Sequence, residues 1–228
     1  VYIFYRNHLK WPKNIQIQFA RSLFLFLSTI LFFYAISVIS LAESLTLAFI
    51  APIIVTILSS VLLKEKVGLR RWIAVSIGFV GALVVMRPGF NQINIASLAA
   101  LGTGISYAFY VISTRKLSTS DSPLLTLIFT GVSGAILISF VVPFFWSYLN
   151  LFQWFLLISL ALVGTLGHFL LILSLRYAEA SKLAPFAYFE IVTNIIIGYY
   201  FFNDFPDKWI WIGLFFIIFS GIYISLRE

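Results

Sequence analysis

The sequence contains no cysteine among its 228 residues and has little charge of either sign. Without cysteine the chain can form neither a disulfide nor a thiolate metal site, although this absence does not identify the compartment. Charged residues make up only 10% of the chain, whereas they make up roughly a quarter of a typical soluble domain. Apolar residues make up 61% and aromatic residues 18%. Water is therefore not the main solvent of this chain.

What the sequence has in place of charge is a series of apolar runs. Each run is about as long as a helix must be to cross roughly 30 Å of hydrocarbon. The runs are apolar nearly all round and contain Gly and Pro, as spanning helices do, and they lack the alternation of barrel strands. We predict an all-α polytopic membrane protein with eight spans: Ser22–Ile39, Leu45–Leu63, Trp72–Met86, Ile95–Thr114, Leu124–Trp146, Leu151–Leu175, Leu183–Phe202 and Trp209–Leu226.

The basic residues between the runs indicate the orientation of the chain. With eight spans the loops alternate sides, and one assignment gathers thirteen of the 15 Lys and Arg residues on one side. By the positive-inside rule that side is cytoplasmic, which predicts an inner-membrane protein with a cytoplasmic C-terminus. A net charge of +7 confined to such loops does not indicate nucleic-acid binding. The thirteen are Arg6, Lys10, Lys13, Arg21, Lys64, Lys66, Arg70, Arg71, Arg115, Lys116, Arg176, Lys182 and Arg227, and the two opposite are Arg87 and Lys208.

One pair of helices occurs twice. The stretch from Ser40, with its turn "KEKVGLRR", aligns with the stretch from Ala178, with its turn "NDFPDK", at an offset of about 140 residues. Lys64 and Glu65 then align with Asn203 and Asp204. The charge pattern places the two turns on opposite sides of the membrane, so the copies run in opposite directions, as in many transporters.

These blocks resemble the EamA-like members of the drug/metabolite transporter superfamily. The resemblance is carried by residues 33–89 and by "LRYAEASKLAPFAYFEIV" with the segment that follows it, which look like the branch of S-adenosylmethionine and riboflavin uptake proteins. It implies ten helices in two inverted five-helix repeats, here residues 1–94 and 95–228. The chain opens on "VYIFY" rather than Met, so we expect the first helix and most of the second to be missing.

A polar stripe on the span from residue 95 is the first candidate for a binding site. Hydroxyl groups recur there at helical spacing, which predicts a face toward the bundle interior. The alternative is that they bond to their own backbone or to neighbouring helices. The stripe comprises Thr103, Ser106, Tyr107, Tyr110 and Thr114.

Glu190 is the only acid well inside a predicted span, and Asn194 follows it by one turn. A carboxylate there is costly unless it is protonated, paired or wetted, which favours a functional role. Tyr188 lies beside it and could stack on a substrate together with Tyr107 and Tyr110. The alternative is a protonated Glu190 that joins two helices by a hydrogen bond.

His168 is the second titratable candidate, since imidazole titrates near neutral pH and could exchange a proton with Glu190. Gly164 and Gly167 adjoin it, so close helix packing is the alternative that we favour. Small-residue stripes at Ala74–Gly78–Ala82 and Ala100–Gly104–Ala108 are predicted packing faces. Pro52 and Pro185 predict kinks in matched helices.

No sequence motif indicates catalysis: the chain has no phosphate-binding Gly loop with Lys, no zinc-spaced His-Glu pair and no GxSxG. We therefore predict a secondary transporter without cofactor or metal that moves a small metabolite by alternating access. Proton coupling through Glu190 is a hypothesis. An intramembrane lipid-modifying enzyme and a channel-like protein remain as alternatives, and the sequence leaves substrate and homodimer formation open.

Overall fold

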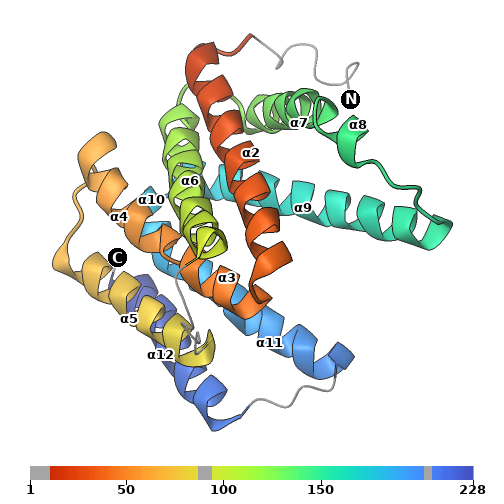
Figure 1. The fold of residues 1–228 in the computed structure, drawn as a ribbon. Coiled ribbons are helices and arrows are strands. Elements are labelled where there is room, and N and C mark those ends of the chain that lie inside the picture. The colour runs from red at the N-terminus through yellow and green to blue at the C-terminus, as the bar shows by residue number, and fades with distance from the viewer. Residues whose placement is uncertain (1–10, 87–93, 203–206, 228) are drawn as a thin grey trace. The chain divides into compact units, whose positions relative to one another are not determined.

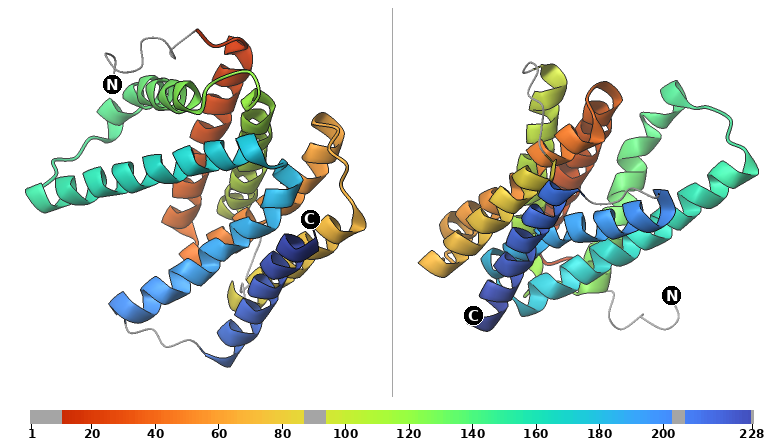
Figure 2. Two further views of the ribbon diagram at one scale, coloured as in Figure 1. Left: turned by 180° about the vertical axis from the view of Figure 1, so that it is seen from behind. Right: turned by 90° about the horizontal axis from the view of Figure 1, so that it is seen from below.

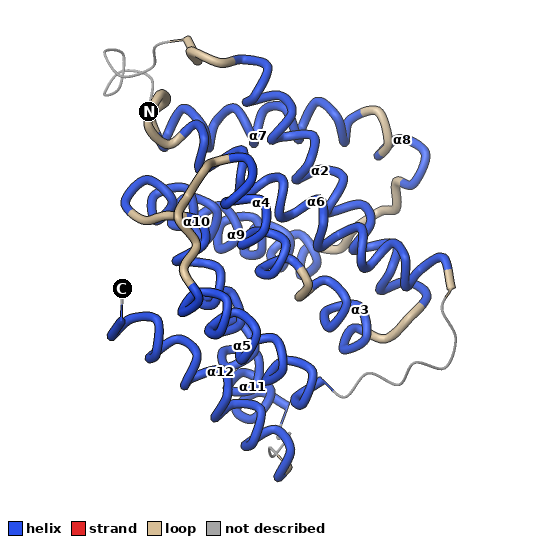
Figure 3. The backbone as a smooth tube through the Cα atoms, turned by 90° about the vertical axis from the view of Figure 1, so that its left-hand side faces the viewer, coloured by secondary structure: helices blue, strands red, loops and turns tan. Residues whose placement is uncertain are grey.

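The computed structural model describes residues 11–86, 94–202 and 207–227, and all regular structure in these ranges is helical (Figures 1 and 3). In chain order the elements are α2 (Ile15–Val38), α3 (Leu41–Ala48), α4 (Ala51–Leu62), α5 (Leu69–Met86), α6 (Ile95–Leu117), α7 (Pro123–Ser139), α8 (Val142–Phe145), α9 (Leu151–Tyr177), α10 (Ala180–Leu183), the 3₁₀ helix η1 (Ala184–Tyr188), α11 (Phe189–Phe202) and α12 (Lys208–Arg227). Six segments of the described part are long and apolar enough to cross a membrane. The predicted all-α polytopic membrane fold is confirmed.

Each of the eight predicted runs is helical, but four differ in detail from the prediction. The run from Leu124 is divided into α7, which ends at Ser139, and the short α8. α2 begins at Ile15, before the predicted start at Ser22. The run from Leu45 is divided into α3 and α4, and the run from Leu183 begins within α10 and continues through η1 and α11. Arg6, Lys10, Arg87, Asp204 and the stretch "VYIFY" lie outside the described residues.

The chain forms two compact units. The first unit comprises Val1–Phe26 and Ser113–Ala178, and the second comprises Leu27–Ile112 and Glu179–Glu228. The second unit therefore draws on segments from both halves of the sequence.

In the second unit, α5 and α12 lie side by side (Figures 1 and 2). A Cβ added to Gly81 would lie 2.9 Å from the Gly213 carbonyl oxygen, and one added to Gly213 would lie 2.7 Å from the Gly81 oxygen. The Ser220 hydroxyl donates a hydrogen bond of 2.8 Å to the Ala74 carbonyl. Ala74 is fully buried, and a Cβ at Gly78 would lie 2.4 Å from the Tyr188 ring. The small-residue stripe on α5 is therefore a packing face, as predicted.

The first unit contains α7, α8, α9, the N-terminal part of α2 and the C-terminal end of α6. The Arg115 guanidinium donates a hydrogen bond of 2.7 Å to the Leu175 carbonyl, which joins the end of α6 to the end of α9. Most side chains of α9 are exposed, and they are large and apolar. Such a surface suits contact with lipid rather than with water.

Helix boundaries in the two halves recur at one spacing. α2 ends at Val38 and α9 ends at Tyr177, 139 residues later. The same interval separates the start of α3 from that of α10, and the start of α5 from that of α12. The N-cap residues also match, since Ser40 has φ −61 and ψ 150 and Glu179 has φ −64 and ψ 146.

Candidate functional site

Two broken helices of the second unit organise the candidate site. The first break separates α3 from α4 at Phe49 and Ile50, directly before Pro52 in the first turn of α4. The second break is η1, with Pro185 near its start and Tyr188 at its end. Proline is tolerated where a new helical segment begins, because the amides of the first turn have no partner within the helix. The two predicted kinks are therefore interruptions of the helices.

α6 approaches the first break closely. A Cβ added to Gly104 would lie 2.5 Å from the Ala48 carbonyl oxygen, so only glycine allows this approach. Ala100 and Ala108, on the same face of α6, are fully buried. The predicted packing stripe on α6 thus lies against the Ala48 carbonyl. Pro52, four residues after Ala48, has no N–H and cannot donate a helical hydrogen bond to that carbonyl.

Tyr188 connects the two breaks. Its side chain is fully buried, and its hydroxyl donates a hydrogen bond of 3.4 Å to the Phe49 carbonyl. The Phe49 and Tyr188 ring centroids are 5.8 Å apart, and Gly78 on α5 leaves room for the Tyr188 ring. The structure therefore places Tyr188 in the core, where it fixes the start of α11.

Glu190 is the second residue of α11 and is exposed. Tyr107 of α6 lies close enough to Glu190 and to Tyr110 for electrostatic interaction. The Tyr107 and Tyr110 ring centroids are 5.6 Å apart. Three of the residues selected from the sequence, on two different helices, are thus brought together. Asn194, one turn after Glu190, is also exposed.

The remaining hydroxyl groups of the α6 stripe are buried. Thr103 donates a hydrogen bond of 3.1 Å to the Ala99 carbonyl of its own helix, and its carbonyl accepts one of 3.2 Å from Ser28. Ser106 is 6% exposed. Thr103 therefore shows the alternative behaviour, in which a hydroxyl bonds to its own backbone.

His168 belongs to the first unit, on α9, where it is half-buried and interacts electrostatically with Arg21. A Cβ added to Gly164 or Gly167 would meet nothing within 4 Å. Among the described residues, no helix therefore packs closely against these glycines.

A polar cluster in the first unit was missed by the sequence reasoning. Arg21 lies inside α2 and is fully buried. Its Nε donates a hydrogen bond of 2.6 Å to Thr114 Oγ1, and its Nη1 donates to Thr130 Oγ1. One turn earlier, Gln18 Nε2 donates a hydrogen bond of 2.8 Å to Asp121. These bonds explain why α2 extends beyond its predicted start, because they satisfy polar groups that an isolated spanning helix could not bury.

Within the described residues, no three His, Asp or Glu side chains converge as metal ligands would. Glu190 and the tyrosine pair are suited instead to an organic molecule that carries an aromatic ring and a positive charge or a hydrogen-bond donor.

Comparison with known proteins gives a consistent family. The EamA-like transporter family matches residues 2–87 and 94–227. An S-adenosylmethionine uptake transporter of Rickettsia bellii is 28% identical over 98% of this chain and 76% of its own length. A riboflavin transporter of Vibrio cholerae is 29% identical over 82% of this chain and 63% of its own length.

A solved crystal structure shares the fold. It superposes with a TM-score of 0.82 and covers 96% of this chain and 80% of its own chain, at 16% sequence identity. At this identity the likeness concerns the fold alone.

Proposed function

Because this chain belongs to the EamA-like transporter family, we propose that it moves its substrate by alternating access, with Glu190, Tyr107 and Tyr110 at the substrate site. The protein is an integral membrane transporter of small metabolites and not an enzyme. The observation that carries the proposed site is the proximity of the exposed Glu190 on α11 to Tyr107 on α6, whose ring centroid is 5.6 Å from that of Tyr110.

We propose a metabolite with a fused nitrogen heterocycle as the substrate. The two relatives are named for S-adenosylmethionine and riboflavin, which both contain such a ring system. Tyr107 would stack on the ring, with the fully buried Tyr110 packed against Tyr107 from the protein side, and Glu190 would meet a positive charge or a donor group. Asn194 completes the proposed site, whereas the buried Thr103 and Ser106 lie behind it and Tyr188 acts on it by positioning Glu190.

The inverted-repeat architecture, with repeats 1–94 and 95–228, is part of the same proposal. Its support is the constant spacing of 139 residues between helix boundaries and the match of the family in two segments. At this spacing Gly81 corresponds to Ser220, and Ala74 corresponds to Gly213. The Gly81–Gly213 contact is therefore the counterpart of the Ser220–Ala74 contact, and the structure contains both. A two-fold relation between the repeats would produce such a pair of contacts.

We further propose that the side with thirteen basic residues faces the cytoplasm, which places the protein in the bacterial inner membrane with its C-terminus inside. This side is called the basic end below. A homodimer stays a prediction.

Uptake into proteoliposomes tests the proposed function. We expect labelled S-adenosylmethionine or riboflavin to enter with saturable kinetics and to exchange with unlabelled substrate. A flux that does not saturate would favour the channel-like alternative. Absence of uptake for both compounds would contradict the proposed substrate class.

Proton coupling through Glu190 is a separate hypothesis. It predicts that Glu190→Gln removes the pH dependence of uptake, because an amide cannot exchange a proton. Glu43→Gln, which alters an acid in the first turn of α3, should retain that dependence. His168→Gln tests the second titratable group: pH-dependent uptake should fall if His168 carries protons. An unchanged pH profile in Glu190→Gln would contradict the hypothesis.

A further inference from the structure

The turn between α4 and α5 presents an acidic side chain to a distant part of the chain. After α4, Lys64 adopts φ 56, in the left-handed region that non-glycine residues rarely occupy. The Glu65 amide then donates a hydrogen bond of 3.1 Å back to the Ser59 carbonyl. The backbone is therefore held in a specific turn, and the Glu65 carboxylate extends from it to the start of α10.

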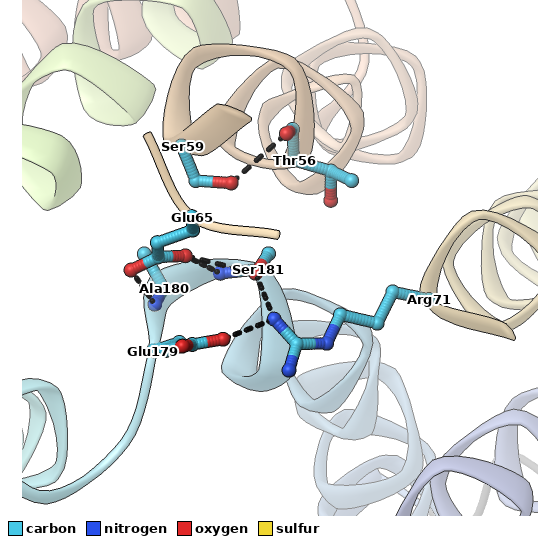
Figure 4. Close-up of polar contacts among 7 residues, drawn as sticks. All are labelled: Thr56, Ser59, Glu65, Arg71, Glu179, Ala180 and Ser181. Carbon is cyan, nitrogen blue, oxygen red and sulfur yellow. Dashed lines mark hydrogen bonds and ion pairs between the residues drawn. The ribbon is translucent and has the colours of Figure 1, made fainter. Parts of the chain in front are cut away.

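Glu65 caps α10 from outside that helix (Figure 4). Its two carboxylate oxygens accept hydrogen bonds of 3.0 Å from the Ala180 amide and 3.1 Å from the Ser181 amide. The Ser181 hydroxyl donates a third, of 2.8 Å. A carboxylate at a helix N-terminus satisfies amides that have no partner within the helix and interacts favourably with the helix dipole.

The corresponding helix in the first half is capped differently. Ser40, the N-cap residue of α3, accepts a hydrogen bond from the Glu43 amide through its own side chain. Glu179, the N-cap residue of α10, makes no such bond. α10 therefore depends on a residue 115 positions away for a function that α3 performs locally.

Arg71, at the start of α5, engages the same helix end. Its Nη1 donates a hydrogen bond of 2.7 Å to the Ser181 hydroxyl and forms an ion pair with Glu179 (Figure 4). The Ser181 hydroxyl thus lies between Glu65 and Arg71. Ser181 is fully buried and Arg71 is 8% exposed, whereas the Glu179 side chain is partly exposed.

These contacts are suited to reversible opening. α10 has only four residues and passes directly into η1, which contains Pro185. A segment this short has little helical hydrogen bonding of its own, so its position depends on its external partners. Lys64, Lys66 and Arg70 place the turn at the basic end, where water can replace each hydrogen bond when the groups separate.

We propose that Glu65, Arg71, Glu179 and Ser181 form a latch that holds the α4–α5 turn to α10 and that opens when the transporter opens toward its basic end. The proposal rests on the proposed alternating-access function. Since α10 leads through η1 to Glu190, movement of α10 away from the turn would reach the proposed substrate site through one short segment.

Thiol labelling tests the latch, because the chain has no cysteine of its own. One reporter is Ser59→Cys, at a fully buried position in α4 at the base of the turn. The other is Tyr200→Cys, at an exposed position near the end of α11 that is remote from α10. The rate of reaction with a water-soluble maleimide is measured for each reporter alone and combined with Glu65→Ala or with the control Glu43→Gln.

Glu65→Ala should accelerate labelling of the Ser59→Cys reporter by about tenfold, a moderate expectation for three lost hydrogen bonds to one carboxylate. It should also slow labelling of the Tyr200→Cys reporter, because opening one end of an alternating-access carrier closes the other. Glu43→Gln should change neither rate. Unchanged rates in Glu65→Ala would overturn the latch, and so would acceleration at both reporters, which would indicate loss of the fold.

A charge exchange provides a second variant that retains the number of charges. Arg71→Glu should accelerate labelling of the Ser59→Cys reporter, and addition of Glu179→Arg should restore the slow rate. Failure to restore it would overturn the ion pair as part of the latch. Labelling needs no substrate, so it tests the latch independently of uptake. Unchanged labelling rates with normal uptake would count against the latch alone. The expected labelling rates without uptake would count against the proposed function alone.

Discussion

The two broken helices share a backbone plan and differ in chemistry. At the spacing of 139 residues, Phe49 corresponds to Tyr188 and Ala51 corresponds to Glu190. The first break is buried: Ala51 is 7% exposed, and the buried Thr56 donates a hydrogen bond of 2.8 Å to the Pro52 carbonyl. The second break carries the exposed Glu190. The first break is a packing element, and the second bears the ionisable group of the proposed site.

The prolines show that the breaks do not depend on one shared residue. Pro52 follows the first break, whereas Pro185 lies near the start of the second. Neither corresponds to the other at the common spacing. Each break has its own proline near the start of a new helical segment, where proline is tolerated.

The largest effect is expected when the acid of the second break is introduced at the corresponding position of the first break. Ala51→Glu puts a carboxylate at a buried position, and we expect it to lower the free energy of unfolding by about 3 kcal/mol or more. Thermal unfolding in detergent measures this, with Glu190→Ala as the matched change in the second break. Equal stability of Ala51→Glu and the wild type would contradict the distinction between a buried first break and an exposed second break.

Gly104→Ala should have the next largest effect. The new methyl group would meet the Ala48 carbonyl at the first break, and such overpacking costs about 1–3 kcal/mol. Gly131→Ala on α7, where a Cβ meets nothing within 4 Å, is the control and should stabilise by about 0.5–1 kcal/mol. If both variants have the same Tm, α6 does not approach the first break as described.

A smaller effect is expected where the two breaks meet. Tyr188→Phe removes the hydrogen bond to the Phe49 carbonyl and keeps the ring contact, so stability should fall by about 0.5–1.5 kcal/mol. Since Tyr188 is buried, the KM for uptake should not change. An increased KM with unchanged stability would instead indicate that Tyr188 contacts the substrate.

Sequence patterns predicted the features that depend on local composition. Run length and hydropathy were enough to locate the helices, and the small-residue stripes on α5 and α6 were enough to locate packing faces. These features depend on neighbours within a few turns, and the sequence displays such neighbours directly.

Polar partners far apart in the sequence could not be predicted. Arg21 was assigned to a loop because it is charged, and its partners Thr114 and Thr130 are about a hundred positions away. Glu65 and Ser181 were likewise ordinary loop residues in the sequence. The burial of Tyr188 depends on Gly78 and Phe49 of other helices. Each of these contacts requires tertiary pairing, which periodicity does not encode.

The initial rate of uptake by Glu190→Gln, measured beside Glu43→Gln in proteoliposomes, tests whether the substrate site lies at the second break. We expect Glu190→Gln to lower the rate by about tenfold or more, through the loss of one charged contact, while its Tm stays close to that of the wild type. Glu43→Gln, in the first of the two broken helices, should transport normally. Wild-type uptake by Glu190→Gln would contradict the assignment of the substrate site to the second break.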